Sequence, residues 1–207
     1  MKVLLASHNA KKLAELRRLA EGLGIDVVGL DAVDPYDEPV EDGHTFVDNA
    51  LLKARAGFVA SGLPTLADDS GIEVDVLNRM PGVRSARWAG PAKDDAANNA
   101  LVLAQIDDVP DERRTGRFVC VVALVSADGE HVVRGEMPGR LAREERGSNG
   151  FGYDPLFVPE GETRTSAELT PDEKDAISHR GKAMRAILPL LALLEEPEAA
   201  EAGGDAR

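Results

Sequence analysis

The residues whose types could do chemistry gather in the last third of this chain: Phe151, Gly152, Tyr153, Asp154, Lys174, His179 and Arg180. Phe151 or Tyr153 can stack on an aromatic base, and Asp154 can accept hydrogen bonds from ring N–H groups. The three basic side chains can donate to keto oxygens or to phosphate. This set predicts a site for a flat, phosphorylated ring, for which a nucleotide is the natural ligand. The alternative is a glycine-rich turn with a core aromatic, followed by a helix capped by Ser178.

A second set, Ser7-His8-Asn9-Ala10-Lys11-Lys12, joins an apolar strand predicted at residues 2–6 to a helix predicted at 10–23. A helix N-terminus offers unpaired N–H groups and a partial positive charge, which favour phosphate. Ser7 and Asn9 would add polar contacts, and Lys12 would add a cation. The segment lacks the glycines of a Walker loop. The alternative is an ordinary helix cap followed by solvated lysines.

Two adjacent carboxylates occur in Asp68-Asp69-Ser70-Gly71, after a brief apolar strand predicted at residues 65–67. Neighbouring side chains on a strand point to opposite faces, so only one carboxylate is expected to face a given site. A turn at Ser70-Gly71 would expose it. One of the two aspartates could bind Mg²⁺ or orient an attacking water. The alternative is an acidic turn with local Asx hydrogen bonds.

An acidic, proline-containing loop is predicted at residues 31–43, and it contains Glu41-Asp42-Gly43. Carboxylate oxygens suit Mg²⁺, which usually takes one or two of them and leaves its other positions to water and phosphate. A solvated acidic loop is the commoner meaning of such composition. A metal site at Glu41 therefore depends on its lying close to Asp69.

Composition and charge narrow the class of protein. The chain has 207 residues, 43% of them hydrophobic, and a formal net charge of −13, which argues against a protein that wraps duplex nucleic acid. A single triphosphate needs only a few local cations. The longest apolar run, residues 186–194, is about half of the roughly 20 residues that a membrane helix needs. We expect a cytoplasmic protein, with the single Cys120 as a small core residue.

Hydrophobic periodicity predicts alternating strands and helices in the first half of the chain and a hairpin in the second. Strands are expected at residues 26–30, 72–76 and 155–158, helices at 45–60, 94–106 and 183–195, and a loop at 79–93. Strands at 117–126 and 131–137 flank an Asp128-Gly129 turn, typical of a β-hairpin. The pattern indicates an α/β fold with a mixed β-sheet flanked by helices and a site at strand ends. One domain is expected at residues 1–195, followed by a disordered Ala/Glu/Gly tail at 196–207.

Taken together, the chain resembles the inosine triphosphate pyrophosphatase family over residues 1–195. The resemblance is carried by Ser7-x-Asn9-x-x-Lys12, Asp68-Asp69-Ser70-Gly71, Phe151-Gly152-Tyr153-Asp154 and Ser178-His179-Arg180 in this order. It implies an elongated sheet, two lobes with a substrate cleft between them, and a homodimer. It also implies Mg²⁺-dependent hydrolysis of dITP, ITP and XTP to the monophosphate and pyrophosphate, which keeps these nucleotides out of DNA and RNA.

The resemblance also implies roles for individual residues. Asp69 would bind the metal and act as base for the attacking water, and Glu41 would be the second metal ligand. Substrate contacts would come from Ser7, His8, Asn9, Ala10, Lys11, Lys12, Ser70, Phe151, Gly152, Tyr153, Asp154, Lys174, His179 and Arg180. His8 stands where glycine is common in the family, a departure that bears on the local geometry of the phosphate-binding turn more than on activity.

Two alternatives remain open at this point. One is a pyrophosphatase of a related fold that acts on modified pyrimidine triphosphates or dTTP. The base-edge cluster from Asp154 to Arg180 disfavours this alternative. The other is a nucleotide-binding regulator without catalysis, which the presence of both Glu41 and Asp69 disfavours. A 6-keto purine accepts hydrogen bonds where adenine donates, so a pocket lined by donors would leave buried groups unpaired with ATP.

Overall fold

The structure, a computed structural model, describes residues 1–194. The predicted tail at 196–207, and residue 195 at the end of the predicted final helix, lie outside the described residues. No helix in the part of the chain that the structure describes is long and apolar enough to cross a membrane.

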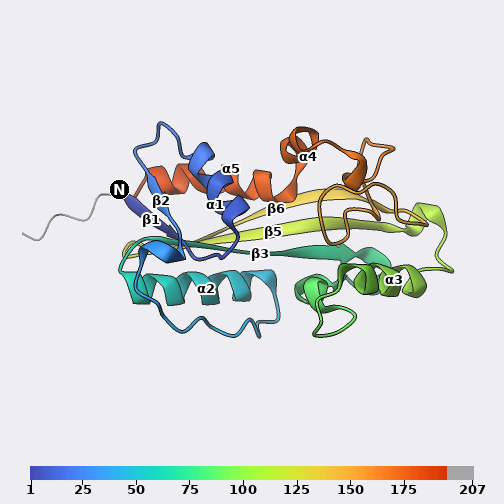
Figure 1. Cartoon of the computed structure of the whole chain (residues 1–207), viewed down its shortest axis with the longest axis horizontal. Helices are drawn as coiled ribbons and strands as arrows, with labels where there is room; N and C mark the ends of the chain where they lie inside the picture. The colour runs from blue at the N-terminus through green and yellow to red at the C-terminus, as the bar shows by residue number, and fades with distance from the viewer. Residues whose placement is uncertain (195–207) are drawn as a thin grey trace, which may run out of the picture.

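A single seven-stranded mixed sheet runs along the molecule (Figure 1). The strands are β1 (Lys2–Leu5), β2 (Asp26–Val28), β3 (Thr65–Val74), β4 (Met80–Pro81), β5 (Thr115–Ser126), β6 (Gly129–Leu141) and β7 (Phe157–Pro159). Their order is β2-β1-β3-β5-β6-β7, with β4 paired to β3. β1 is parallel to β2 and β3, and the other pairs are antiparallel. The predicted mixed sheet is confirmed, as is the predicted hairpin, β5–β6.

Helices cover both faces of the sheet. They are α1 (Ala10–Leu19), α2 (Phe46–Ser61), α3 (Asp95–Gln105), α4 (Pro171–Ile177) and α5 (His179–Ala192), with short 3-10 turns η1 (Leu30–Ala32), η2 (Asp75–Leu77), η3 (Gly82–Arg87), η4 (Asp111–Arg113) and η5 (Ser166–Glu168). In Figure 1, α1, α4 and α5 lie above the sheet, and α2 and α3 lie below it. The predicted flanking helices are therefore confirmed.

Two apolar layers result from this arrangement. Cys120, Val122 and Leu124 of β5 pack with α1 and α5, whereas the intervening residues of β5 pack with α2. A strand covered on both faces is expected to be apolar throughout, which accounts for the continuous hydrophobic run of β5. Cys120 is buried, as predicted, and its burial, with a smaller contribution from Asp68, raises the pKa of its thiol.

Local sequence signals fix several helix ends. Thr45 and Asp48 form a capping box at the start of α2, and Asp94 caps α3 by accepting from the Ala97 N–H. Ser178 caps α5 by accepting from the Gly181 N–H at 3.0 Å. The helix cap that the sequence offered as an alternative for Ser178 is therefore present.

Other predictions were wrong. The expected turn at Ser70-Gly71 does not form, because residues 65–74 pair without interruption with β5. The expected loop at 79–93 contains β4 and η3, and α4 was not predicted. The final helix begins at His179 rather than at 183, and the strand predicted at 26–30 ends at Val28. Pairing with β5 keeps residues 65–74 in one strand, and the Ser178 cap sets the start of α5.

One edge of β3 is open where the acidic motif lies. β1 pairs with β3 only at Thr65 and Leu66, and β4 pairs with it only at Glu73 and Val74. Among the described strands, none pairs with this edge between residues 67 and 72. Asp68 and Asp69 therefore lie on a segment of β3 that is paired with β5 on one edge and has no strand partner among the described residues on the other.

Candidate active site

A cavity of about 500 Å³ is lined by residues of α1, α4 and the start of α5, and also by residues of η3 and α3. It brings together the predicted residues Ser70, Phe151, Gly152, Tyr153, Asp154, Lys174, His179 and Arg180. It also includes residues that the sequence did not single out, among them Glu15 and Arg18 of α1 and Asp95 of α3. We call it the base cavity, because its aromatic and polar lining suits a heterocycle.

The choice between Phe151 and Tyr153 is settled by burial. Tyr153 is buried and its hydroxyl donates to the Ser85 carbonyl at 2.8 Å, so it is a core residue. Phe151 is 62% exposed, and its ring centroid is 5.5 Å from Lys174 Nζ and 6.0 Å from Arg180 Cζ. An exposed aromatic ring flanked by cations is available for stacking on a ligand.

Asp154 is held in one orientation by its neighbours. Its Oδ2 atom accepts from Lys174 Nζ at 2.5 Å and from the Phe151 N–H at 2.9 Å. Gly150 has a φ of +80°, and a Cβ at that position would lie 2.1 Å from the same oxygen. No hydrogen bond to Asp154 Oδ1 occurs among the described residues, so this atom remains as an acceptor for a ligand.

His179 does not supply positive charge. Its ring is buried and stacks on Phe118 with centroids 5.1 Å apart. Burial, followed by the positive charges of Arg180 and Lys174, lowers the pKa of His179 to about 3. The imidazole is therefore neutral near pH 7, and of the three basic side chains predicted here only Lys174 and Arg180 bring charge. Within the described part of the chain, His179 Nδ1 has no hydrogen-bond partner.

Lys12 already has a carboxylate partner. Its Nζ donates to both oxygens of Asp68, at 2.7 and 2.9 Å, and Asp68 is buried. Burial raises the pKa of Asp68, but Lys12, Arg180 and Lys53 together lower it further, so that the net shift is downward. Asp68 therefore stays ionised, and it holds Lys12 at the open edge of β3.

The rest of the first turn forms the helix cap that the sequence offered as an alternative. The Asn9 N–H donates to Ser7 Oγ at 3.3 Å, and the Lys12 N–H donates to Asn9 Oδ1 at 3.3 Å. His8 is exposed and pairs with Glu38. Ser7, His8, Asn9 and Ala10 line neither of the two cavities described in this section. Their phosphate contacts, and those of Lys11, remain predictions.

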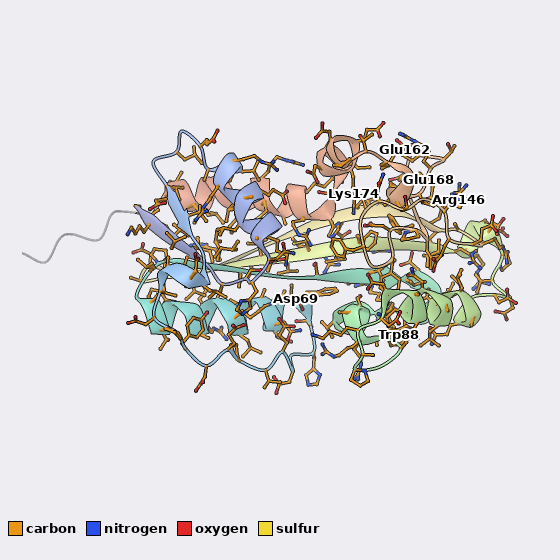
Figure 2. All side chains as sticks on the ribbon, in the orientation of Figure 1. Asp69, Trp88, Arg146, Glu162, Glu168 and Lys174 are labelled. Carbon is orange, nitrogen blue, oxygen red and sulfur yellow. The ribbon has the colours of Figure 1, made fainter. Side chains whose placement is uncertain are left out.

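Asp69 points to the opposite face, towards α2, as the alternation along a strand requires. Its Oδ2 accepts from Asn49 Nδ2 at 2.9 Å, and its Oδ1 accepts from the Ser70 N–H at 2.9 Å. Asn49 Oδ1 in turn accepts from the Gly43 N–H at 2.9 Å. Asn49 therefore ties the acidic loop to Asp69. Figure 2 places Asp69 beside α2 and Lys174 on α4, on opposite sides of the sheet.

Lys53 links Glu41 to the backbone of Asp68, the residue before Asp69. Its Nζ lies 2.6 Å from Glu41 Oε1 and donates to the Asp68 carbonyl at 2.6 Å. Burial raises the pKa of Asp69, Asn49 and Lys53 oppose the rise, and Glu41 adds to it. The metal site at Glu41 and Asp69 remains a prediction.

The donor set fits a hard divalent cation. Two carboxylates match the one or two that Mg²⁺ usually takes from a protein. Across residues 1–194, no group of three or more His, Cys, Asp or Glu side chains is arranged to hold a metal. The geometry therefore suits an ion that keeps positions for water and phosphate, and it does not suit a closed structural site.

A second cavity, of about 900 Å³, adjoins Glu41 and Lys53. We call it the charged cavity, because Arg84, Arg87 and Lys93 also line it, with Glu38 and Asp42. η3 separates the two cavities: Ser85 and Ala86 line the base cavity, and the flanking residues line the charged one. Ser70 and Gly71 of β3 line the base cavity, and Lys53, which lines the charged cavity, donates to the Asp68 carbonyl.

Sequence reasoning missed Asn49, Lys53 and Arg87. The sequence did contain a signal for Asn49 and Lys53. They are four residues apart on α2, so they share one helix face, and α2 closely follows the acidic loop. Arg87 carried no such signal. Its Nη2 donates to the Glu41 carbonyl at 3.3 Å, a contact between segments 46 residues apart.

Comparisons with known proteins agree with one another. A sequence model described as the Ham1 family matches residues 3–190. A protein of Nocardia farcinica named dITP/XTP pyrophosphatase is 61% identical, with 94% of this chain and 97% of that protein covered, and one of Corynebacterium diphtheriae with the same name is 60% identical, with coverage of 93% and 97%.

Solved structures give the same result. A nucleoside-triphosphatase, also titled dITP/XTP pyrophosphatase, from Mycobacterium abscessus has a TM-score of 0.80 and 58% identity, covering 91% of this chain and 100% of that one. The Ham1 protein of Staphylococcus aureus has a TM-score of 0.86 and 35% identity, covering 92% and 98%.

Proposed function

This chain belongs to the Ham1 family, and from that premise we propose that it hydrolyses dITP, ITP and XTP to the monophosphate and pyrophosphate. One observation carries the proposal: a base-sized cavity and a charged cavity lie on either side of η3, the first lined by Ser70, next to Asp69, and the second by Lys53, which donates to the Asp68 carbonyl. A nucleoside triphosphate has the same division into a flat ring and a charged chain. The enzyme would remove these nucleotides before they enter DNA or RNA.

The base would be recognised by hydrogen bonds of defined direction. Phe151 stacks on the ring, Asp154 Oδ1 accepts from a ring N–H, and Lys174 or Arg180 donates to a keto oxygen. Adenine carries an amino group where hypoxanthine carries the 6-keto oxygen, so it would place a donor against these cationic donors. Buried groups left unpaired in this way cost binding energy, and ATP is excluded for that reason.

The chemistry would take place on the α2 side of the sheet. Mg²⁺ held by Glu41 and Asp69 would neutralise charge on the phosphate oxygens. Asp69, with its raised pKa, accepts a proton from the attacking water, and Asn49 fixes the orientation of its carboxylate. Lys12 and Lys53 are positioned by Asp68 and Glu41 to contact the phosphates.

A panel of triphosphates tests this function. dITP, ITP, XTP, dATP, dGTP, dTTP and dCTP are incubated with the protein and Mg²⁺, and orthophosphate and pyrophosphate are measured separately. We expect pyrophosphate and the monophosphate from the first three. Orthophosphate as the only product, faster turnover of dTTP or dCTP, or tight binding of ITP without hydrolysis would each contradict the proposal.

Three further expectations belong to the same proposal. The protein would act as a homodimer in the cytoplasm, and residues 1–195 would form one catalytic domain with the tail at 196–207 outside it. Analytical ultracentrifugation measures the assembly, and the mass of two chains is expected.

Full activity and unchanged stability after removal of residues 196–207 would support the domain boundary, and loss of either would contradict it.

We expect Arg87→Ala to weaken inhibition by pyrophosphate about tenfold, since a hydrogen bond to a charged group typically contributes roughly 1.5–3 kcal/mol. Arg87 lines the charged cavity next to Glu41, where the leaving pyrophosphate would lie. The inhibition constants for pyrophosphate and for inosine monophosphate are measured in parallel. Arg18→Ala is the matched control, because Arg18 lines the base cavity. An unchanged pyrophosphate constant in Arg87→Ala would remove Arg87 from this role.

A further inference from the structure

α3 contacts residues 149–153, which we call the base-stacking loop, through both backbone polar groups of Gly152. The Gly152 N–H donates to Asp95 Oδ2 at 2.7 Å, and the Gly152 carbonyl accepts from Asn99 Nδ2 at 3.1 Å. Asp95 and Asn99 are four residues apart on α3, so they lie on the same helix face. They therefore hold both sides of the residue that follows Phe151.

The same turn of α3 also fixes the opposite wall of the base cavity. Asn98 Nδ2 donates to the Ala86 carbonyl at 3.2 Å, and Asn98 Oδ1 accepts from the Ala89 N–H at 2.7 Å. Ala86 lines the base cavity. One helix face thus sets the position of η3 on one side of the cavity and of the base-stacking loop on the other.

This restraint acts on a loop whose other hydrogen bonds at Phe151 come from Asp154: the Phe151 N–H donates to Asp154 Oδ2 at 2.9 Å, and the Phe151 carbonyl accepts from the Asp154 N–H at 3.3 Å. Gly152 has a φ of +60° and Gly150 a φ of +80°, and glycine reaches such angles without steric cost but also leaves them readily. Phe151 lies between them and is largely exposed. Contacts of its own ring with neighbouring side chains are cation–π contacts to Lys174 and Arg180, which are tolerant of small shifts. Asp154 holds the backbone of Phe151 itself, and the hydrogen bonds to Gly152 hold the residue that follows it, so both sets of contacts set the height of the ring over a base.

Asn99 shows that this position serves more than packing. Asn99 is buried, and within residues 1–194 its Oδ1 has no hydrogen-bond partner. An unpaired buried acceptor is destabilising, and an apolar residue of similar shape would avoid that cost. We therefore attribute the presence of an amide at this position to the hydrogen bond that Asn99 Nδ2 donates to the Gly152 carbonyl.

We propose that Asp95 and Asn99 are positioning residues that set the height of Phe151 over the base and thereby the affinity for the purine. The inference rests on the proposed function, since it presumes that the base cavity holds the ring. It predicts that their loss weakens binding of anything that carries the base and leaves binding of pyrophosphate alone. If Asp95 and Asn99 only stabilised the fold, their loss would lower stability and would weaken the binding of base-containing ligands and of pyrophosphate alike.

The test uses Asp95→Ala and Asn99→Leu in the full chain. For each variant we expect the inhibition constant for inosine monophosphate and the KM for dITP to rise about tenfold. The inhibition constant for pyrophosphate stays within twofold of the wild-type value, and so does kcat. Asn99→Leu is expected to melt at or above the wild-type temperature, because it removes the unpaired acceptor. Asp111→Ala, which removes a carboxylate from the surface pair with Arg143, is the matched control.

The emission of Trp88, the single tryptophan, checks that α3 stays packed, because its Nε1 donates to Gln105 of that helix at 2.8 Å (Figure 2). Unchanged constants for inosine monophosphate in both variants would overturn the inference, as would equal losses for inosine monophosphate and pyrophosphate. A wild-type protein that releases no pyrophosphate from dITP would instead overturn the proposed function. The two failures are therefore distinguishable.

Discussion

Asp69→Asn is expected to lower kcat for dITP by about a thousandfold or more while the fold is retained. A positioned general base contributes roughly 10²–10⁴ to a rate, and loss of a metal ligand adds to that effect. Asparagine has nearly the same shape, and its oxygen can still accept from Asn49 or from the Ser70 N–H. What it cannot do is accept a proton or present two anionic oxygens.

The measurement is pyrophosphate release under saturating dITP and Mg²⁺, with circular dichroism as the check on folding. Asp37→Asn is the matched control, because it removes an exposed carboxylate from the same acidic region without touching β3. A kcat within tenfold of wild type in Asp69→Asn would assign the proton transfer to another group. A thousandfold loss in Asp37→Asn as well would point to the overall charge of the region.

The raised pKa of Asp69 also has consequences for pH dependence. Burial, with a contribution from Glu41, raises this pKa above its ordinary value of 3.8. A carboxylate with a lowered pKa stabilises the folded state more as the pH rises. Asp69 should do the opposite, because its raised pKa means that the folded state binds the proton more tightly than the unfolded state.

Without metal, wild-type stability should therefore decrease as the pH rises through the interval between the unfolded and the folded pKa. The Asp69→Asn variant should lack this decrease. Denaturant unfolding of both proteins between pH 4 and pH 8 measures the difference. A wild-type protein that gains stability relative to the variant over this range would show that the pKa of Asp69 is lowered rather than raised.

The sequence predicted those parts of the fold that depend on local signals. The capping residues Thr45 and Asp94 stand where helices were expected, and the hairpin of β5 and β6 forms where an Asp-Gly pair was read as a turn. These features depend on hydrogen bonds between residues close in the chain. The turn expected at Ser70-Gly71 failed because pairing with β5, some fifty residues later, decides the conformation there.

In the candidate site, too, some features follow from residue type, and others depend on burial or on partners distant in the sequence. Phe151, Asp154 and Lys174 were found because their types are informative in themselves. The structure shows, beyond residue type, that Tyr153 is a core residue, that burial keeps His179 neutral and that Lys12 is paired with Asp68. Each of these depends on burial or on a partner distant in sequence. Composition and spacing do not contain that information.

Asp154→Ala is expected to raise the KM for dITP about a hundredfold, with kcat changed less than fivefold, and to bring the kcat/KM values of dITP and dATP closer together. The carboxylate is proposed to read the base edge beside Lys174, its hydrogen-bond partner, which lies on the side of the sheet opposite to Asp69 (Figure 2), so its loss should alter the choice of substrate more than the cleavage step. It should also destabilise the protein, because Lys174 is left largely buried without its partner. Removing one partner of a buried pair typically costs about 3–5 kcal/mol.

The double variant Asp154→Ala/Lys174→Met separates these two effects. Removing both charges relieves the unpaired ammonium, so most of the lost stability should return. Selectivity should not return, because neither the acceptor nor the donor for the base is present. Urea unfolding and kcat/KM for dITP, ITP, dATP and dGTP are measured for the single and double variants. If the double variant recovered the wild-type ranking of substrates together with its stability, Asp154 would be a structural residue and base selection would have to be assigned to Phe151 and Arg180.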